Sequence, residues 1–218
     1  MKRELHMKQA DTKERILDAA ERLFADEGFH NASLRTITRE ANANVAAVNY
    51  HFGSKEALLE TVFERRLVPL NRLRRDLLEN VRRQAHADGQ RPRPREVLRA
   101  FIEPTLAFRD SSPGAAGFVR LVGRAIAEPD DTLRKIFMRQ MEPIFFLLYD
   151  LLQEALPQLT PDILFWRLHF SLGAMSHTMC MAGRFQLLPA GVSPPNDAAS
   201  LTSLVLDFVT AGMEAPCA

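Results

Sequence analysis

Cysteine is scarce in this chain of 218 residues: only Cys180 and Cys217 occur, one in an apolar segment and one beside the C-terminus. Two thiols so placed exclude a disulfide framework and argue against a zinc site. No apolar run approaches the roughly 18 residues that a membrane-spanning helix needs. The N-terminal sequence MKRELHMKQADTKER is charged and lacks the apolar core of a secretory signal. We therefore expect a cytoplasmic protein without a membrane partner.

Catalytic motifs are also missing. The chain has no G-x-S-x-G motif, no phosphate-binding glycine loop, and no cysteine and histidine spacing suited to a metal. We therefore expect neither an enzyme nor a protein that needs a cofactor. The formal net charge of +1 does not exclude a nucleic-acid partner, because phosphate contacts need only a local basic face.

Apolar residues recur at intervals of three and four along most of the chain, and no alternating strand pattern occurs, so an all-α fold is predicted. The first helix is expected from an N-cap at Thr12 to Glu27, and the second after a cap at Ser33. A short third helix should span residues 44–52. A long fourth helix should span residues 54–84, with a kink at Pro69. Further helices are expected at 95–109, 115–128, 131–156, 161–186 and 196–214.

Three short helices within the first fifty residues, with the second and third joined by a tight turn at Asn42–Asn44, describe a helix-turn-helix. The last helix of that motif enters the DNA major groove. Its side chains suit this role: Asn49 can donate to and accept from an adenine edge, while Tyr50 and His51 can reach phosphates. Lys55, in the first turn of the next helix, adds a positive charge to exposed backbone N–H groups.

The segment RILDAAERLFADEGFHNASLRTITREANANVAAVNYHFGSKEALLETVF resembles the DNA-binding domain of TetR-family transcriptional regulators. YHFGSKEAL and the pattern A..LF...G are its most specific marks. The resemblance implies a helix-turn-helix domain at residues 1–58 and a larger helical effector-binding and dimerisation domain at 59–218. Family members contact operator DNA at the positions of Ser33, Arg35, Thr36, Asn44, Val45, Ala46, Ala47, Asn49, Tyr50, His51 and Lys55.

Two departures from the family pattern fall in this motif. Asn42-Ala43 stands where the family commonly has glycine and then valine, and asparagine can adopt the same backbone conformation. Val45-Ala46 stands where many members carry lysine, arginine or glycine, which removes a direct charge and leaves more of the base contacts to Asn49.

The resemblance implies a homodimeric repressor that binds double-stranded, palindromic operator DNA and is released by a small hydrophobic or amphipathic effector. FVRLVGRA and FWRLHFSLGA are similar to TetR regulators of fatty-acid metabolism, which implies a fatty-acyl effector. The last two helices would form the dimer interface. Its expected members are Gly173, Ala174, Ser176, Leu201, Leu204, Val205, Phe208, Val209 and Gly212.

Aromatic residues and methionines are frequent in the second half, and most of them are expected in the core. An effector cavity also needs apolar walls with a few polar groups. Arg120 and Arg124 lie four apart on one helix face and would suit an acidic effector. The alternative is that Arg120 pairs with an acidic residue such as Glu142 and that His169 belongs to the core or an interface. The predicted effector-binding residues are Phe101, Phe108, Arg120, Arg124, Phe145, Trp166, His169, Phe170 and Met175.

Other interpretations stay open. The arginines between residues 72 and 83 indicate a basic patch or, as we favour, a solvated helix face; they are Arg72, Arg74, Arg75, Arg82 and Arg83. Lys2, Arg3 and Lys8 form either an arm that reaches the minor groove or, as we favour, a disordered end. The same fold could act as an activator or as a corepressor-dependent regulator. An all-α enzyme or ligand carrier is the alternative from another class.

Overall fold

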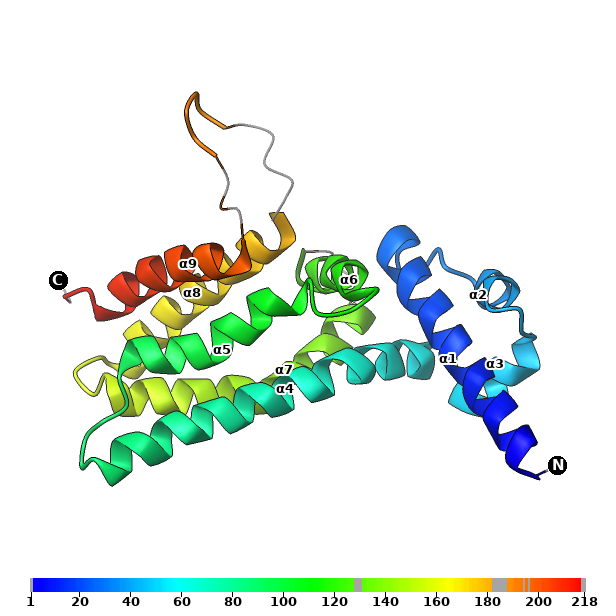
Figure 1. Ribbon diagram of the computed structural model, residues 1–218, viewed down its shortest axis with the longest axis horizontal. Coiled ribbons are helices and arrows are strands. Elements are labelled where there is room, and N and C mark those ends of the chain that lie inside the picture. Colours follow the sequence, from blue (N-terminus) through cyan, green and yellow to red (C-terminus); the bar gives the residue numbers. More distant parts are fainter. Residues whose placement is uncertain (1, 128–130, 182–187, 194, 196, 217–218) are drawn as a thin grey trace. The chain divides into compact units, whose positions relative to one another are not determined.

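The computed structural model describes residues 2–127, 131–181, 188–193, 195 and 197–216. Over these residues the chain forms nine α-helices and no strand, which confirms the predicted all-α fold (Figure 1). The helices are α1 (Lys2–Glu27), α2 (Leu34–Glu40), α3 (Val45–Phe52), α4 (Lys55–Ala87), α5 (Pro94–Phe108), α6 (Ala115–Ala127), α7 (Asp131–Ala155), α8 (Pro161–Met181) and α9 (Ala198–Glu214).

The helices gather into two compact units. Unit 1 comprises Met1–Pro69 and Ser112–Gln140, and unit 2 comprises Leu70–Ser111 and Met141–Ala218. Helix α4 runs without interruption through Pro69, the residue at which its two parts divide between the units. These units are compact bodies of the fold, whereas the division into residues 1–58 and 59–218 concerns function and remains a prediction.

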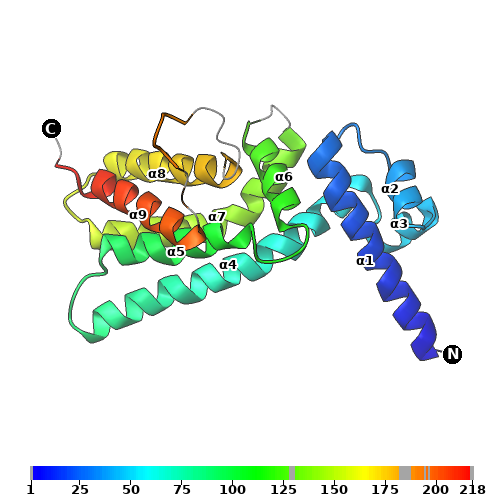
Figure 2. The same cartoon turned by 45° about the horizontal axis from the view of Figure 1, so that its top comes forward.

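In unit 1, α1 packs against α2, α3 and α6 (Figures 1 and 2). Ile16, Ala20 and Phe24 of α1 are all buried, as the spacing of apolar residues at three and four positions requires. The predicted N-cap at Thr12 is wrong: Thr12 lies inside α1, where its hydroxyl accepts a hydrogen bond from Arg15. The residues before Thr12 include no glycine or proline, and extending a helix costs far less than starting one.

The first half of α4 supplies the other side of this core. Leu58, Leu59 and Val62 are buried. The ring of Phe63 lies 5.3 Å from that of Phe118 on α6, in the edge-to-face arrangement that aromatic pairs favour. This apolar contact anchors α6 to the start of α4.

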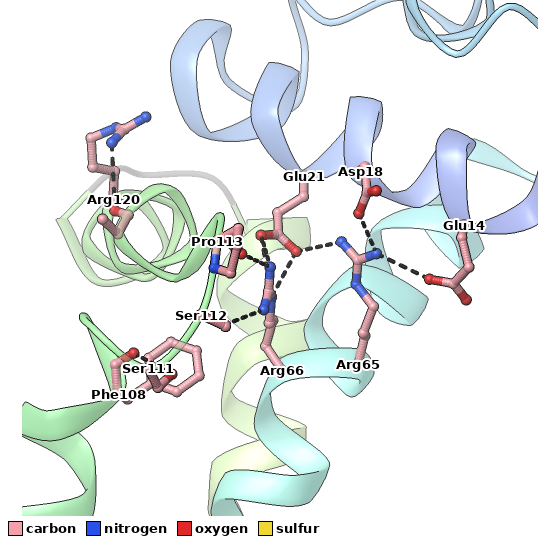
Figure 3. Close-up of polar contacts among 11 residues, drawn as sticks. Glu14, Asp18, Glu21, Arg65, Arg66, Phe108, Ser111, Ser112, Pro113 and Arg120 are labelled. Atoms are coloured by element: carbon pink, nitrogen blue, oxygen red, sulfur yellow. Dashed lines mark hydrogen bonds and ion pairs between the residues drawn. The ribbon is translucent and has the colours of Figure 1, made fainter.

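A buried carboxylate on α1 holds two arginines of α4, as Figure 3 shows. Glu21 is only 3% exposed. Its oxygens lie 2.6 Å from Nη2 of Arg65 and 2.7 Å from Nη2 of Arg66. Burial alone lowers the pKa of Arg65, but the hydrogen bonds and charges of Glu21 and Asp18 outweigh it and raise that pKa. We name the trio of Glu21, Arg65 and Arg66 the Glu21 cluster.

The Glu21 cluster extends to the segment that leads into α6. Arg66 donates from Nη1 to the hydroxyl of Ser112 at 2.9 Å and from Nη2 to the carbonyl of Pro113 at 3.0 Å (Figure 3). Gly114 follows with φ of +83°, and a Cβ there would lie 2.7 Å from Nη2 of Arg66. Glycine is therefore favoured at this position by its positive φ, and its small size leaves room for the guanidinium of Arg66.

In unit 2, α5 lies beside α9 and also contacts α8, and α8 lies beside α9 (Figure 2). Apolar side chains from all three helices are buried here, among them Leu98, Leu168 and Leu206. Arg167 of α8 donates from Nη1 to the carbonyls of Met213 at 2.8 Å and Ala215 at 2.7 Å. A cation is favourable at a helix C-terminus, so Arg167 stabilises the end of α9 instead of lining a cavity.

Candidate nucleic-acid interface

Side-chain caps start α2 and α3 as the sequence predicts. The hydroxyl of Ser33 accepts a hydrogen bond from the backbone N–H of Thr36 at 3.0 Å. Asn44 Oδ1 accepts from the N–H of Ala47 at 2.8 Å. These bonds satisfy backbone donors that a helix start leaves unpaired, so the two positions are fixed by local chemistry.

The turn between α2 and α3 depends on Asn42, the only residue other than glycine with a positive φ among those described (φ 48°). The N–H of Ala43 donates to the carbonyl of Thr38 at 2.8 Å, and the N–H of Asn42 donates to the carbonyl of Arg39 at 3.2 Å. This bonding pattern is the Schellman motif, with Asn42 where glycine is usual. The prediction that asparagine preserves the turn is confirmed.

Replacing Asn42 with valine should lower the free energy of unfolding by about 1–2 kcal/mol, because a β-branched residue strains a left-handed backbone. Asn42→Gly should stay within about 0.5 kcal/mol of the wild type, because glycine adopts this conformation freely. Urea denaturation of the three proteins measures both effects. Equal stability of the valine variant would contradict the importance of this turn.

Helix α3 separates its side chains into an inner and an outer set. Val48 is fully buried, and Phe52 is partly buried. Asn49 is exposed, and Tyr50 is 74% exposed. Val45 and Ala46 are exposed as well, while Ala47 and His51 are partly buried. The outer set therefore combines small residues at the start of α3 with hydrogen-bonding groups further along it, an arrangement that suits a groove floor and its walls.

The start of α4 follows directly. Gly53 ends α3 with φ of +82°, and the hydroxyl of Ser54 accepts from the N–H of Ala57 at 3.1 Å. Lys55 Nζ lies 4.5 Å from the ring centre of Phe29 and 3.4 Å from the carbonyl of His30. Burial, opposed by the charge of Glu56, lowers the pKa of Lys55. Lys55 thus also supports the fold, and its contact with a phosphate remains a prediction.

Arg120 and Arg124 belong to a different unit from the other predicted effector-binding residues. Arg120 Nη2 lies 2.6 Å from Asp26 Oδ1 on α1. The guanidinium of Arg124 lies against Gly28, just after α1: a Cβ added to this glycine would be 2.4 Å from Nη1 of Arg124. Both arginines belong to unit 1, whereas the seven other predicted residues belong to unit 2. Arg120 therefore forms the ion pair that the alternative expected, with Asp26 in place of Glu142, and its contact with an effector remains a prediction.

The predicted aromatic residues of α8 point to solvent. Trp166 is 54% exposed and Phe170 is 66% exposed. His169 is exposed too, and its ring lies 5.7 Å from that of Trp166. These residues form an outer surface in this chain instead of the wall of an enclosed cavity. Of the predicted effector-binding set, Phe101 and Met175 are buried, while Phe108 and Phe145 are partly buried.

Arg74 overturns part of the prediction for the arginines of α4. Arg72 and Arg75 are exposed, as a solvated face requires, but Arg74 is only 3% exposed. Its position falls between Leu70 and Leu78, which are buried. Spacings of four residues on either side place Arg74 on the apolar stripe of α4, and this signal was available in the sequence.

The expected dimer interface also needs a correction. Val205 and Val209 of α9 are buried within the chain, so they cannot face a partner. Leu204 and Phe208 of the same helix are exposed, at 58% and 72%. Adjacent positions on a helix point in different directions, which is why one apolar helix supplies both the core and an outer surface.

Two family models match the chain. Residues 16–62 match the family model for bacterial regulatory proteins of the tetR family. Residues 99–212 match the model for the tetracyclin repressor-like C-terminal domain, which covers more than half of the chain. Among the described residues, no helix is long and apolar enough to cross a membrane.

Curated relatives match over short segments of the chain. The HTH-type transcriptional regulator UidR of Escherichia coli K12 is 39% identical over 51 residues, which are 23% of this chain and 26% of UidR. The nicotine-responsive repressor HdnoR of Paenarthrobacter nicotinovorans is 38% identical over 56 residues, 26% of this chain and 29% of HdnoR. The chain thus spans only about a quarter of the length of UidR and of HdnoR.

Solved structures share the fold over nearly the whole chain. FadR from Bacillus subtilis, solved in complex with stearoyl-CoA, has a TM-score of 0.67 at 15% identity and covers 91% of this chain and 97% of its own. PfmR from Thermus thermophilus has a TM-score of 0.62 at 20% identity and covers 92% and 99%. With both family models matched and a helix-turn-helix in place, the chain belongs to the TetR family of transcriptional regulators.

Proposed function

We propose that this chain is a homodimeric repressor that binds a palindromic operator and releases it when a small hydrophobic effector binds. The observation that carries the proposal is the outer face of α3, where Asn49 and Tyr50 are exposed while Val48 holds the helix to the core. Two such helices, related by a two-fold axis, would enter successive major grooves about 34 Å apart.

Exposed apolar side chains on neighbouring helices support the dimer. Helices α8 and α9 lie side by side. They carry Phe165, Trp166, Phe170, Leu204 and Phe208, each at least 41% exposed, which we name the apolar face. Apolar surface of this kind on adjacent elements marks a protein–protein contact site. A second copy of the chain is the proposed partner of this face. Val205 and Val209 lie beneath it in the core of their own chain.

An effector would bind among the helices matched by the C-terminal family model. Two relatives support this chemistry: FadR was solved with stearoyl-CoA, and HdnoR is named as nicotine-responsive. An effector can release DNA only by binding the DNA-free conformation more tightly, commonly by about 1–3 kcal/mol. Helices α4 and α7 pass through both units, so they provide covalent paths for this coupling.

The operator contact can be tested on the two tyrosines of the chain. Tyr50→Phe removes an exposed hydroxyl from the outer face of α3, whereas Tyr149→Phe removes one that donates to the carbonyl of Pro161 in unit 2. One hydrogen bond contributes about 1 kcal/mol, and a dimer loses two, so Tyr50→Phe should weaken binding by about 30-fold. Tyr149→Phe should bind as the wild type does.

The assay is an electrophoretic mobility shift with DNA from upstream of the gene that encodes the chain. Its arms use the wild type, both tyrosine variants and an unrelated duplex of equal length at the same salt concentration, because phosphate contacts depend on salt. Equal affinity of the wild type for both duplexes would contradict operator recognition. Equal loss in both variants would contradict the role of Tyr50.

A further inference from the structure

Arg74 is the most deeply buried arginine among the residues that the structure describes. It lies on α4 in unit 2, one turn after Leu70 and one turn before Leu78. Placing a guanidinium among leucines costs free energy unless its charge and its five N–H groups find partners. The identity of those partners therefore indicates whether Arg74 has a structural role or a binding role.

The partners of Arg74 are neutral. Nε and Nη2 donate to the hydroxyl of Thr105 at 3.2 Å and 2.7 Å, and Nη1 donates to Oδ1 of Asn71 at 2.7 Å. The central carbon lies 4.4 Å from the ring centre of Phe101. The last contact is weak: Nη1 lies 3.8 Å from the sulfur of Met141, a poor acceptor.

None of the described residues supplies a carboxylate to Arg74. Burial lowers the pKa of Arg74 to about 9, with no opposing acidic group, so the side chain is still protonated at neutral pH. The Glu21 cluster shows the usual solution in this same chain, where two partly buried arginines share one carboxylate. Arg74 is more buried than either and lacks such a partner, which leaves a desolvated positive charge without an anion.

We infer that Arg74 is the anion-recognising group of the effector site, and that the effector is an apolar compound with a carboxylate. This inference rests on the proposed function. A guanidinium binds a carboxylate with a planar, bidentate fit, and the effect is strongest where water is excluded. The Nη1 contact to Met141 is the one that a carboxylate oxygen would replace, and the flexible thioether can move aside.

The neighbours of Arg74 fit the apolar body of such an effector. Phe101, which the sequence predicts as an effector contact, is buried directly beside the guanidinium. Thr105 and Asn71 hold the guanidinium from its other sides, so its orientation does not depend on the ligand. Preorganised donors of this kind bind tightly because little ordering is needed at the moment of binding.

Dodecanoate and dodecan-1-ol are suitable probes, because they share a chain and differ in charge. Binding to the full-length protein is measured by calorimetry, below the concentration at which dodecanoate forms micelles. The wild type should bind dodecanoate about 10- to 100-fold more tightly than dodecan-1-ol, the range expected for hydrogen bonds to a charged group. Arg74→Met should bind both equally, whereas Arg75→Met, which alters an exposed neighbour, should keep the wild-type preference.

A second measurement separates recognition from a structural role. Without ligand, Arg74→Met should melt at or above the wild-type temperature, because it removes a buried charge that has no counter-ion. A lower melting temperature would mean that Arg74 serves the fold, and equal binding of the two probes by the wild type would also overturn the inference. Arg74→Met should still shift operator DNA in the mobility assay. If the wild type failed to bind DNA but still preferred dodecanoate, the proposed function would be refuted and the inference about Arg74 would stand.

Discussion

Replacing Glu21 with glutamine is expected to lower the free energy of unfolding by about 3 kcal/mol. Removing one member of a buried ion pair typically costs about 3–5 kcal/mol, because the remaining charge stays buried without its partner. The lower end applies here, since the side chains of Arg65 and Arg66 are still 20% and 16% exposed and can be partly hydrated. Glutamine keeps the shape of the glutamate side chain, so the loss in the free energy of unfolding measures the contribution of its negative charge.

Asp18→Asn is the matched control for Glu21→Gln. Asp18 also lies 2.7 Å from Nη1 of Arg65, but its side chain is 71% exposed. Exposed ion pairs contribute only about 0–1 kcal/mol because water screens them. Urea denaturation at one protein concentration should therefore place Asp18→Asn near the wild type and Glu21→Gln well below it. A similar, small loss in both variants would show that the Glu21 cluster does not stabilise the fold.

The distance along the chain between contacting residues explains which features could be predicted from the sequence. Ser33, Asn44 and Ser54 each bond a backbone N–H three residues later, so their roles are visible in a few consecutive letters. The residues of α3 follow the same logic, because helical spacing alone separates Val48 from Tyr50. The fold and the DNA-binding motif could therefore be predicted almost entirely.

The surroundings of the predicted effector-binding residues could not be predicted in the same way, because their contacts join residues far apart in the chain. Arg120 pairs with Asp26, 94 positions earlier, and no local pattern selects that partner. Trp166 and Phe170 lie in an apolar run that reads as core, but the single chain leaves one side of α8 uncovered. Arg74 is an intermediate case: its spacing from Leu70 and Leu78 indicates burial, whereas the absence of a carboxylate partner needs the tertiary structure.

Phe208→Glu is expected to convert the proposed dimer into a monomer. Phe208 is the most exposed member of the apolar face, at 72%, and lies on α9, one of the two helices that we propose for the interface. A central aromatic contact in an interface contributes about 2 kcal/mol or more. A two-fold axis places two copies in the interface, so the loss is about 4 kcal/mol and the dissociation constant rises about 1,000-fold.

Phe146→Glu provides the control. Phe146 is 54% exposed on α7, so its replacement adds the same charge to a comparably open aromatic site outside the apolar face. Light scattering over a range of concentrations should show a dimer for the wild type and for Phe146→Glu, and a monomer for Phe208→Glu. Circular dichroism should show unchanged helix content in all three, because Phe208 contributes little to the core of its own chain.

Operator binding links this substitution to function. A dimer binds two half-sites together, and the second contact benefits from a high effective concentration once the first has formed. The Phe208→Glu monomer retains Asn49 and Tyr50 on an intact α3, yet it should lose at least about 100-fold in affinity for the full operator. If the monomer bound as tightly as the wild type, recognition would not require two-fold symmetry, and a single helix-turn-helix would be sufficient for DNA binding.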